Sequence, residues 1–383
     1  MPASEVEVDS SLIFALSEGI GPRPPTSNQE HVAAEVIAGE FEELGLSSKI
    51  EYFDSQRSFG PTYLVMFLIA LLAGPLARRS RLAGTLAGLV ATALGAAESG
   101  FALRSPLNLL RTRRSQNVWS VIEPESAPQQ TICLVSHMDS SRSGLMFHPR
   151  FTPYLGRASF AAGVALMLNG VAPLISWMPP GRLLVKAARG LIGLSALLVL
   201  ERELRGEDVP GANDNASGVA ACLNLARQFD GDRLEHSRLV ILVTGSEESG
   251  VIGMREFLRR NDTGGWIFIN FDGVSADAPL RVLSREGGPT GSKADPDLMA
   301  TAERVGRKHP ELAAEPLLDG SGLPYDATVV NARGGRAITI ANQSGAILNY
   351  HWPTDSAANI SEPAFAKAVR FAAALVEELD GEA

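Results

Sequence analysis

Two hydrophobic regions constrain the fold more than any other feature of the sequence. Residues 58–77 carry no charge over 20 positions, the length that a helix needs to cross a hydrocarbon core about 30 Å thick. After Arg78, Arg79 and Arg81 comes a shorter uncharged run of 16 residues, 82–97, rich in glycine and alanine. Because small residues let membrane helices approach closely, we expect the two runs to form a membrane hairpin.

A second hydrophobic region has the same two-part form. Residues 158–181 are uncharged over 24 positions, and residues 183–200 follow with Lys186 and Arg189 as their charges. Hydropathy therefore predicts four membrane spans. Two alternatives remain: residues 183–200 could lie at the membrane surface as an amphipathic helix, or the hydrophobic segments could form a soluble helical subdomain.

Outside these regions, apolar strand patterns alternate with helical ones. The predicted strands are 49–53, 117–123, 131–137, 237–245, 266–274 and 336–342, and the predicted helices are 29–45, 214–228, 251–260, 295–308 and 362–379. Such alternation predicts a mostly parallel sheet with helices on both faces. The expected fold class is α/β, with three α/β/α layers around a mostly parallel mixed central sheet, interrupted by two helical membrane hairpins.

Charge and cysteine content exclude several function classes. A formal net charge of −9 argues against a nucleic-acid partner, because phosphate binding needs clustered Lys and Arg, whereas it suits a site for cations. With only Cys133 and Cys222, neither a disulfide scaffold nor a thiolate zinc cluster is expected, and both are predicted core residues. Residues 1–11 are acidic and lack the basic start and apolar stretch of a secretory signal.

Ligands of open α/β sheets bind beyond the carboxyl ends of strands, and polar clusters occur at such places here. His137 and Asp139 follow the apolar strand 131–137, where an imidazole can bind metal while a carboxylate fixes its orientation. Asp214 stands at the start of the predicted helix 214–228. Taken alone, the first cluster is an ordinary loop histidine and the second an ordinary helix cap.

Three further clusters supply carboxylates and a second histidine. Glu247 and Glu248 follow a strand as adjacent carboxylates, so burying both requires a cation or a shared proton. With a metal present, one can bind it while the other acts as a general base. Asp272 ends another strand, and His351 is followed by Asp355. Each of these is also common in solvated loops.

In this order, the clusters resemble the co-catalytic zinc exopeptidases, which include bacterial leucyl aminopeptidase, aminopeptidase Y, glutamate carboxypeptidase and glutaminyl cyclase. The opening Gly21-Pro22-Arg23-Pro24 is similar to that family's usual start. The resemblance covers most of the chain outside the hydrophobic regions. It implies a zinc-exopeptidase-like fold and two Zn²⁺ ions as cofactors.

The resemblance also assigns a role to each cluster. His137 and Asp272 would bind one zinc, Glu248 and His351 the other, and Asp214 would bridge both. Glu247 would be the general base, Asp139 the carboxylate behind His137, and Asp355 a support for the loop of His351. Two histidines and three carboxylates suit zinc on chemical grounds as well, and a shared carboxylate can hold two metals about 3.5–4 Å apart.

The predicted function is that of a membrane-anchored zinc-dependent metallopeptidase, an exopeptidase with aminopeptidase chemistry favoured, which hydrolyses peptide bonds with a water activated by two zinc ions. The alternatives are an amidohydrolase, a carboxypeptidase or a glutaminyl-cyclase-like enzyme on the same scaffold, and a non-catalytic peptidase-like membrane binding protein. Glu247 argues against the binding protein, which needs no general base. Ala327 stands where family members often have a histidine near the substrate, so substrate preference is not implied. The expected partners are a peptide substrate and the lipid bilayer, without nucleic acid.

The hydrophobic regions divide the peptidase domain without splitting its sheet, because each hairpin leaves and returns on the same side. The expected division is peptidase domain at 1–57, 104–155 and 204–383, with membrane hairpins at 58–103 and 156–203.

Basic residues near the span ends predict the orientation of the chain. More of them lie on the catalytic side than at the hairpin tips, so we expect an integral, multi-pass membrane protein with a cytoplasmic catalytic domain. Those on the catalytic side are Arg57, Arg104, Arg111, Arg113, Arg114, Arg150, Arg157, Arg202 and Arg205, against Arg78, Arg79, Arg81 and Arg182 at the tips.

Overall fold

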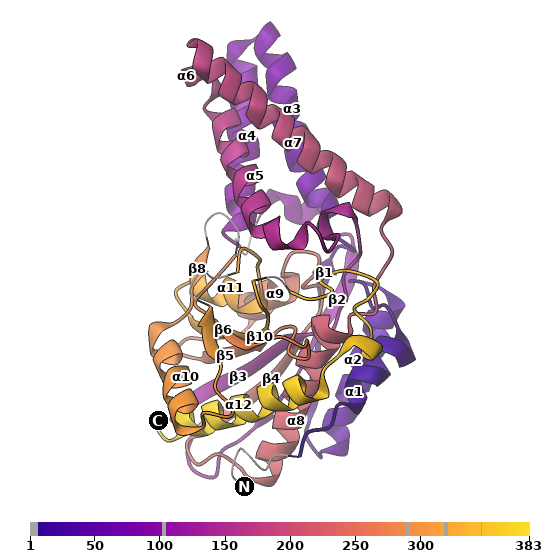
Figure 1. Cartoon of the computed structure of the whole chain (residues 1–383), viewed down its shortest axis with the longest axis vertical. Helices are drawn as coiled ribbons and strands as arrows, with labels where there is room; N and C mark the ends of the chain where they lie inside the picture. The colour runs from indigo at the N-terminus through magenta and orange to yellow at the C-terminus, as the bar shows by residue number, and fades with distance from the viewer. Residues whose placement is uncertain (1–6, 102–104, 288–290, 318–320, 346) are drawn as a thin grey trace.

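An eight-stranded mixed sheet forms the centre of the α/β domain in the computed structural model, which describes residues 7–101, 105–287, 291–317, 321–345 and 347–383 (Figure 1). Its strand order is β1-β2-β4-β3-β5-β10-β6-β9. The strands are β1 Ser48–Ser55, β2 Arg113–Ile122, β3 Gln130–His137, β4 Ser237–Thr244, β5 Ile267–Phe271, β6 Leu280–Leu283, β9 Glu315–Leu317 and β10 Arg336–Asn342. The pairs β4–β3, β3–β5, β5–β10 and β6–β9 are parallel, whereas β1–β2, β2–β4 and β10–β6 are antiparallel. The mostly parallel mixed sheet is therefore confirmed.

Helices cover both faces of this sheet, which explains why its central strands are apolar throughout. The main helices of the domain are α2 Asn28–Glu43, α8 Ser217–Gly231, α9 Ile252–Arg260, α10 Pro296–Lys308, α11 Asp326–Asn331 and α12 Glu362–Asp380. Along β3, Ile132 and Leu134 join the core beneath α2, α8 and α12, while Cys133 and Val135 join the core beneath α9 and α11. Cys133 and Cys222 are both buried core residues, as predicted.

The elements that the sequence did not predict are short. They include β6, β9, α11, the two-stranded sheet of β7 Arg285–Glu286 and β8 Ser292–Lys293, and the N-terminal helical turns α1 Ser11–Phe14 and η2 Ala15–Ile20. The predicted helix 214–228 begins later than expected, at Ser217. Residues Asp214 and Asn215 have non-helical backbone angles: the Asp214 amide donates to the carboxylate of Asp355, and the Asn215 side chain donates to the carbonyl of Phe271 in β5.

The two inserted regions form a helical bundle that rises from one end of the α/β domain, away from both termini (Figure 1). Its helices are α3 Gly60–Arg79, α4 Arg81–Ser99, α5 Leu155–Gly170, α6 Ala172–Ile175 and α7 Pro179–Arg205. Three of them, α3, α4 and α7, are long and apolar enough to cross a membrane, by length and composition. These three helices suggest membrane association.

The expectation of one continuous span at 158–181 is wrong. Helix α5 ends at Gly170, the short α6 follows, and residues 179–181 already belong to α7. Proline explains the break: Pro173 lies in the first turn of α6 and Pro179 begins α7, the positions where a missing backbone N–H is tolerated. Residues 183–200, for which a helix at the membrane surface was the alternative, lie within the longest helix of the bundle.

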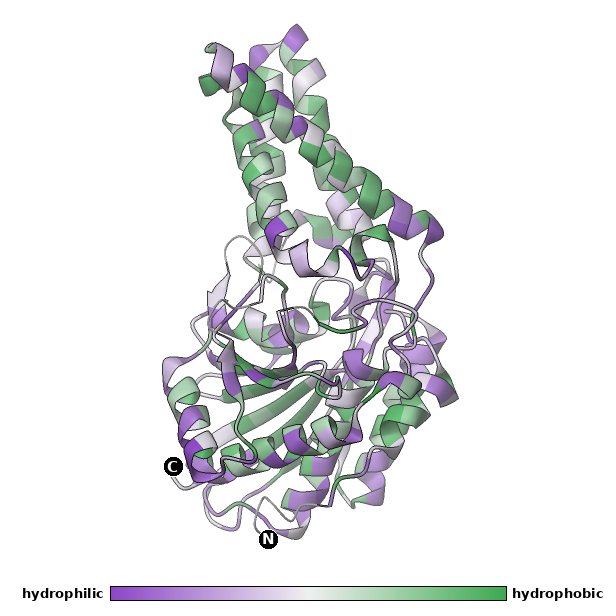
Figure 2. Ribbon diagram, viewed as in Figure 1, coloured by the Kyte–Doolittle hydropathy of each residue, from purple (hydrophilic) through white to green (hydrophobic). Residues whose placement is uncertain are grey.

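The bundle carries apolar residues on its outside as well as between its helices (Figure 2). Phe67, Ala70 and Ile192 are among the buried residues that join its helices. Small residues allow close packing as expected: a Cβ added to Gly88 of α4 would lie 2.9 Å from the carbonyl oxygen of Asn169 of α5. Leu68, Leu86, Leu183 and Leu197 face outward and are exposed. Arg104, which the orientation argument counted, lies outside the described residues.

Candidate metal centre

Three neighbouring parallel strands bring the predicted ligands to one edge of the sheet. His137 is the last residue of β3 and pairs in register with Thr244, the last residue of β4, four positions before Glu248. Asp272 follows directly after β5, which pairs with the other side of β3. The three side chains come from distant parts of the sequence, and the register of the sheet alone places them together.

Asp214 reaches this edge from the segment ahead of α8. Gly218 makes that approach possible, because a Cβ at this position would lie 2.5 Å from the carbonyl oxygen of Phe271, at the end of β5. The side chain of Asn215 adds two hydrogen bonds across the same contact, donating to the Phe271 carbonyl at 2.8 Å and accepting from the Gly218 amide at 3.0 Å. The start of α8 is thereby fixed against the strand that carries Asp272.

The five predicted ligands form two buried groups that share Asp214. In one group, His137 Nε2 lies 3.3 Å from Asp214 Oδ1 and 3.5 Å from Asp272 Oδ2. In the other, His351 Nε2 lies 3.3 Å from Asp214 Oδ2 and 3.0 Å from Glu248 Oε1. Within each group, the possible ligand atoms all lie within 4.8 Å of one another. Each oxygen of Asp214 thus faces a different histidine.

The electrostatics of the two groups fit a bound cation. Burial disfavours a charged imidazole, yet the neighbouring carboxylates raise the pKa of His137 well above its usual value and that of His351 to about 9. Burial, together with the charge of Asp214, raises the pKa of Asp272 to about 6. Burial also opposes ionisation of Asp214, but its hydrogen-bonding contacts with both histidines outweigh this and lower its pKa. Imidazole and carboxylate donors are those that zinc prefers, and zinc would replace the protons that the site otherwise attracts.

Glu247 lies beside the two groups without belonging to either. Its side chain is 9 % exposed and lines a cavity that also reaches Glu248 and His351. Burial first, and the nearby carboxylates next, raise the pKa of Glu247 well above its usual value, against the opposing effect of His137. A carboxylate with a raised pKa at the edge of a cavity is suited to accept a proton and release it again.

Two buried carboxylates hold the loops that carry the ligands. Asp139 accepts hydrogen bonds from the backbone amides of Glu247 and Glu248, at 3.0 and 2.9 Å. His137 Nδ1 lies 3.0 Å from the backbone carbonyl of Asp139, and 3.6 Å from its carboxylate. Asp139 therefore positions both the histidine and the two glutamates.

Asp355 plays a similar part on the other side of the site. Its carboxylate accepts from the backbone amides of Asn213 and Asp214, at 2.8 and 3.1 Å. We expected Asp355 to support the loop of His351, and its carboxylate instead fixes the segment of Asp214. His351 itself has a φ of 51°, and its ring packs against those of Tyr350 and Phe147, with centroids 3.7 and 4.4 Å away.

Arg23 is a buried residue next to the candidate site, which the sequence alone did not reveal. Its guanidinium is fully buried and donates to the backbone carbonyls of Met138 and Gly211, both at 3.0 Å, so it ties together the segments of His137 and Asp214. Burial lowers the pKa of Arg23 to about 10, opposed by Asp355 and other carboxylates of the site, and the side chain stays charged at neutral pH. Arg23 belongs to the Gly21-Pro22-Arg23-Pro24 motif, but nothing in that motif indicates that its side chain is buried.

Glu30 and Asp326 are two more buried acids that the sequence did not single out. Glu30 accepts from the backbone amide of Ser246 at 2.9 Å, and burial raises its pKa well above the usual value. Asp326 accepts from the hydroxyl of Thr244 at 2.6 Å, and burial raises its pKa to about 7. Through these hydrogen bonds, both residues hold the turn after β4 that carries Glu247 and Glu248.

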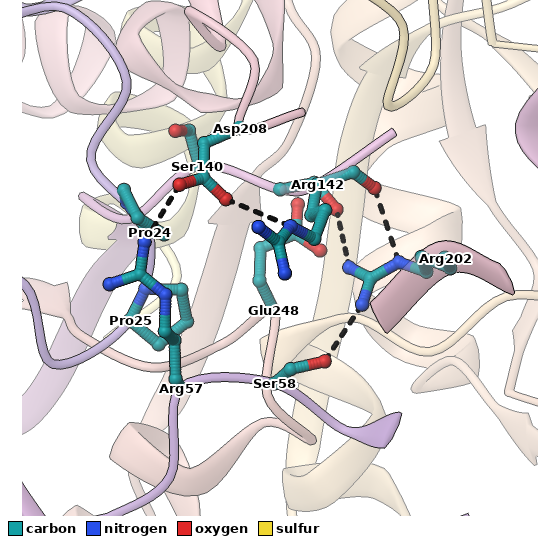
Figure 3. A pocket seen from close by; sticks show the side chains of 10 residues that line it. Pro24, Pro25, Arg57, Ser58, Ser140, Arg142, Arg202, Asp208 and Glu248 are labelled. Atoms are coloured by element: carbon teal, nitrogen blue, oxygen red, sulfur yellow. Dashed lines mark hydrogen bonds and ion pairs between the residues drawn. The ribbon is translucent and has the colours of Figure 1, made fainter. Parts of the chain in front are cut away.

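A cluster of arginines joins the bundle to the metal centre (Figure 3). It borders a small cavity of about 10 Å³ beside Glu248, room for about one water molecule. Asp208 pairs with Arg57 at 2.7 Å and with Arg142 at 3.3 Å, and Arg202 of α7 donates to the hydroxyl of Ser58 at 2.7 Å. Arg202 is 1 % exposed, so this basic residue belongs to the folded core rather than to a surface facing lipid headgroups.

Comparison with known proteins supports the same assignment. Residues 200–376 match the model of Peptidase family M28, a span that includes Asp214, Glu247, Glu248, Asp272 and His351 but begins after His137. The resemblance to the zinc exopeptidases is thereby confirmed. No curated protein sequence matches the chain. The family match supports a hydrolytic metallopeptidase that uses zinc.

Solved structures of several zinc exopeptidases share the fold. A zinc aminopeptidase from Bacillus subtilis aligns with 15 % identity and a TM-score of 0.57, covering 99 % of this chain and 95 % of the other. An aminopeptidase from an Aneurinibacillus species aligns with 14 % identity and a TM-score of 0.58, covering 98 % and 94 %. A glutaminyl cyclase from Bacteroides thetaiotaomicron aligns with 15 % identity and a TM-score of 0.56, covering 97 % and 99 %. At such identities the likeness concerns the fold alone.

Proposed function

We propose that this protein is a membrane-anchored two-zinc aminopeptidase. The observation that carries the proposal is the arrangement around Asp214, whose two oxygens lie 3.3 Å from the histidines of two separate buried groups. A single carboxylate shared in this way can hold two metal ions side by side. His137 and Asp272 would complete one site, and Glu248 and His351 the other.

The residues around the two groups would divide the work of hydrolysis. When bound, the zinc ions would supply Lewis-acid polarisation of the scissile carbonyl and a lower pKa for the attacking water. Glu247 would take a proton from that water and deliver it to the leaving nitrogen. Asp139 would keep Glu247 and Glu248 in place through their amides. Phe147 and Tyr350 would hold the ring of His351.

The preference for peptide N-termini comes from two similar structures, the zinc aminopeptidase from Bacillus subtilis and the aminopeptidase from Aneurinibacillus. An amidohydrolase, a carboxypeptidase or a cyclase could use the same side chains. These activities differ in whether the substrate needs a free amino group, which makes that requirement the decisive test.

A substrate panel provides the test. The protein, purified in detergent with zinc, is assayed on leucine amide, on its N-acetylated form and on peptides with blocked ends, beside Glu247→Gln as an inactive control. We expect hydrolysis of the free-amine substrates only. Cleavage of blocked substrates at equal rates would reject aminopeptidase chemistry, and a folded protein that hydrolyses none of them would reject the proposed function.

We also propose that α3, α4 and α7 cross the membrane, that α5 and α6 together carry the chain across it ahead of α7, and that the catalytic domain is cytoplasmic. Cys133 and Cys222 are buried, so introduced cysteines can be labelled over a low background. Ser80→Cys, at the turn between α3 and α4, should react with an impermeant maleimide in intact cells. Asp262→Cys, on the catalytic domain, should react only after the cells are opened. The reverse pattern would invert the proposed orientation.

A further inference from the structure

A large cavity connects the candidate metal centre with the base of the helical bundle. Its volume is about 610 Å³, within the usual range of small-molecule sites. Glu247, Glu248 and His351 line one end of it, and residues of α3, α5 and α7 line the other. A group held in this cavity would therefore lie directly beside the bond that the site would cleave.

Most of the cavity wall is apolar, and the inserted helices α3, α4, α5 and α7 all contribute to it. Helix α5 contributes Leu155, Ala158 and Ala162, which recur at helical spacing on one face, and α7 contributes Leu198 and Val199, which lie three and four residues after Ser195 on the same wall. The wall includes one oppositely charged pair, Glu98 and Arg255, whose charged atoms lie 3.2 Å apart. Pairing keeps these two side chains from attracting a charged ligand.

A wall of this kind suits an occupant that needs few hydrogen bonds. Peptide backbone placed against it would lose its hydrogen bonds to water and gain few in return, which is unfavourable. An alkyl or acyl chain has no such requirement, and each buried methylene stabilises the complex through the hydrophobic effect.

Exposed residues of the cavity wall indicate where an apolar chain could enter the cavity from a membrane. Leu145, Phe151 and Tyr154 line the cavity, and they are 50 %, 56 % and 57 % exposed. Phe151 and Tyr154 lie just before α5 and Leu145 lies in the short helix η4 Leu145–Phe147 ahead of them, and the helices of the bundle carry apolar side chains on their outer surface (Figure 2). Aromatic side chains at this level are typical of a membrane interface. An apolar chain could thus pass from lipid into the cavity without crossing water.

We infer that the substrate is an amphiphilic amide, an amino acid or short peptide that carries a long apolar chain, with the chain in the cavity and the amide at the metal centre. The inference rests on the proposed function, whose reaction it leaves unchanged. The C–N bond breaks, the carbonyl carbon gains the oxygen of water, and the nitrogen gains a proton. The products are a carboxylic acid and an amine, one of which keeps the chain.

Two substrate series test the inference, in protein reconstituted in phospholipid nanodiscs. Leucine n-alkylamides place the chain on the leaving amine, and amides of 2-amino-n-alkanoic acids place it on the carbonyl side, and both series keep the free amino group. We expect kcat/KM to rise at least about 100-fold from two to ten carbons in one series. Equal values at all lengths in both series would overturn the inference while leaving the proposed function intact.

A matched pair of variants separates the cavity from simple partitioning into lipid. Ala162→Phe would fill the cavity, whereas Ala161→Phe places the same ring on α5 outside the cavity wall. We expect Ala162→Phe to lower the ratio of kcat/KM between the ten-carbon and the two-carbon substrate at least tenfold. Hydrolysis of leucine amide should stay within about twofold of the wild type. Ala161→Phe should match the wild type. An unchanged chain-length dependence in Ala162→Phe would contradict the inference.

Photo-crosslinking decides the question without turnover. A ten-carbon alkylamide of N-methylated leucine with a diazirine at the chain end is irradiated with Glu247→Gln protein, and labelled peptides are mapped. Labels should fall on the α3, α5 and α7 segments of the wall and be lost in Ala162→Phe. Labels confined to the outer faces of the bundle would overturn the inference, whether or not any substrate is hydrolysed. Absence of hydrolysis would reject the proposed function and is a separate result.

Discussion

The α/β domain and the helical bundle place their polar and apolar side chains in opposite ways. The domain buries carboxylates, histidines and a fully enclosed arginine at the end of its sheet, while few of its large apolar side chains are exposed. The bundle exposes leucines along α3, α4 and α7. The difference indicates two different surroundings: the buried acids and histidines of the domain suit a bound cation, and the exposed leucines of the bundle suggest association with a membrane.

The largest effect is expected when Asp214, the candidate ligand that both buried groups share, is removed from the domain. Asp214→Ala leaves both histidine groups incomplete, so we expect kcat/KM for leucine amide to fall more than about 10⁴-fold, a small part of the rate enhancement that enzymes achieve. Circular dichroism should show a folded protein. Residual activity within tenfold of the wild type would mean that Asp214 is not shared between two metals.

Removing the proposed base tests chemistry separately from metal binding. Glu247→Gln keeps the shape of the side chain but cannot accept a proton, so we expect a loss of about 10²–10⁴ in kcat with little change in zinc content. Zinc analysis of the same sample serves as the control. If the variant lost its zinc together with its activity, Glu247 would be a ligand instead.

A smaller effect is expected from the carboxylates that hold the ligand loops. Asp139→Asn weakens the hydrogen bonds to the amides of Glu247 and Glu248, and Asp355→Asn does the same for Asn213 and Asp214. We expect each variant to lose about 10–100-fold in zinc affinity or activity. Zinc titration should show weaker binding in both, and an affinity equal to that of the wild type would make these contacts merely structural.

The smallest catalytic effect is expected from the exterior of the bundle. Leu194→Arg places a charge on an exposed position of α7, where insertion into a membrane would cost about 2.5–3.5 kcal/mol. The fraction of protein in the membrane should fall, while the activity of the inserted protein stays within about threefold. Val32→Arg, at an exposed position of α2, is the matched control and should change neither. Normal membrane content of Leu194→Arg would indicate that α7 is not surrounded by lipid.

Most of the sheet could be predicted from the sequence because apolar runs such as 131–137 identify buried strands. The candidate ligands were predicted differently, from the resemblance of their order to the zinc exopeptidases, because each cluster alone is also common in ordinary loops. The structure brings all five predicted ligands together, with Glu247 beside them.

What the sequence could not show depends on tertiary contacts. Two examples are the burial of Arg23 and the hydrogen bond from the Asp214 amide to the carboxylate of Asp355. Both arise where loops distant in sequence meet in the folded chain. The break at 171–178 was missed for another reason: Pro173 and Pro179 mark it in the sequence, but hydropathy alone does not register proline as a helix boundary. The cavity between bundle and metal centre depends on the angle at which α5 and α7 leave the domain, which no local pattern sets.

Counting zinc ions per folded chain tests the central claim most directly. Wild-type protein and Asp214→Ala, each purified in detergent, equilibrated with excess zinc and then freed of unbound metal, are analysed by mass spectrometry of the intact protein. The shared position of Asp214 predicts two ions bound to the wild type and fewer than one to the variant. A folded wild type that binds one ion or none, or a variant that keeps two, would contradict a two-metal site.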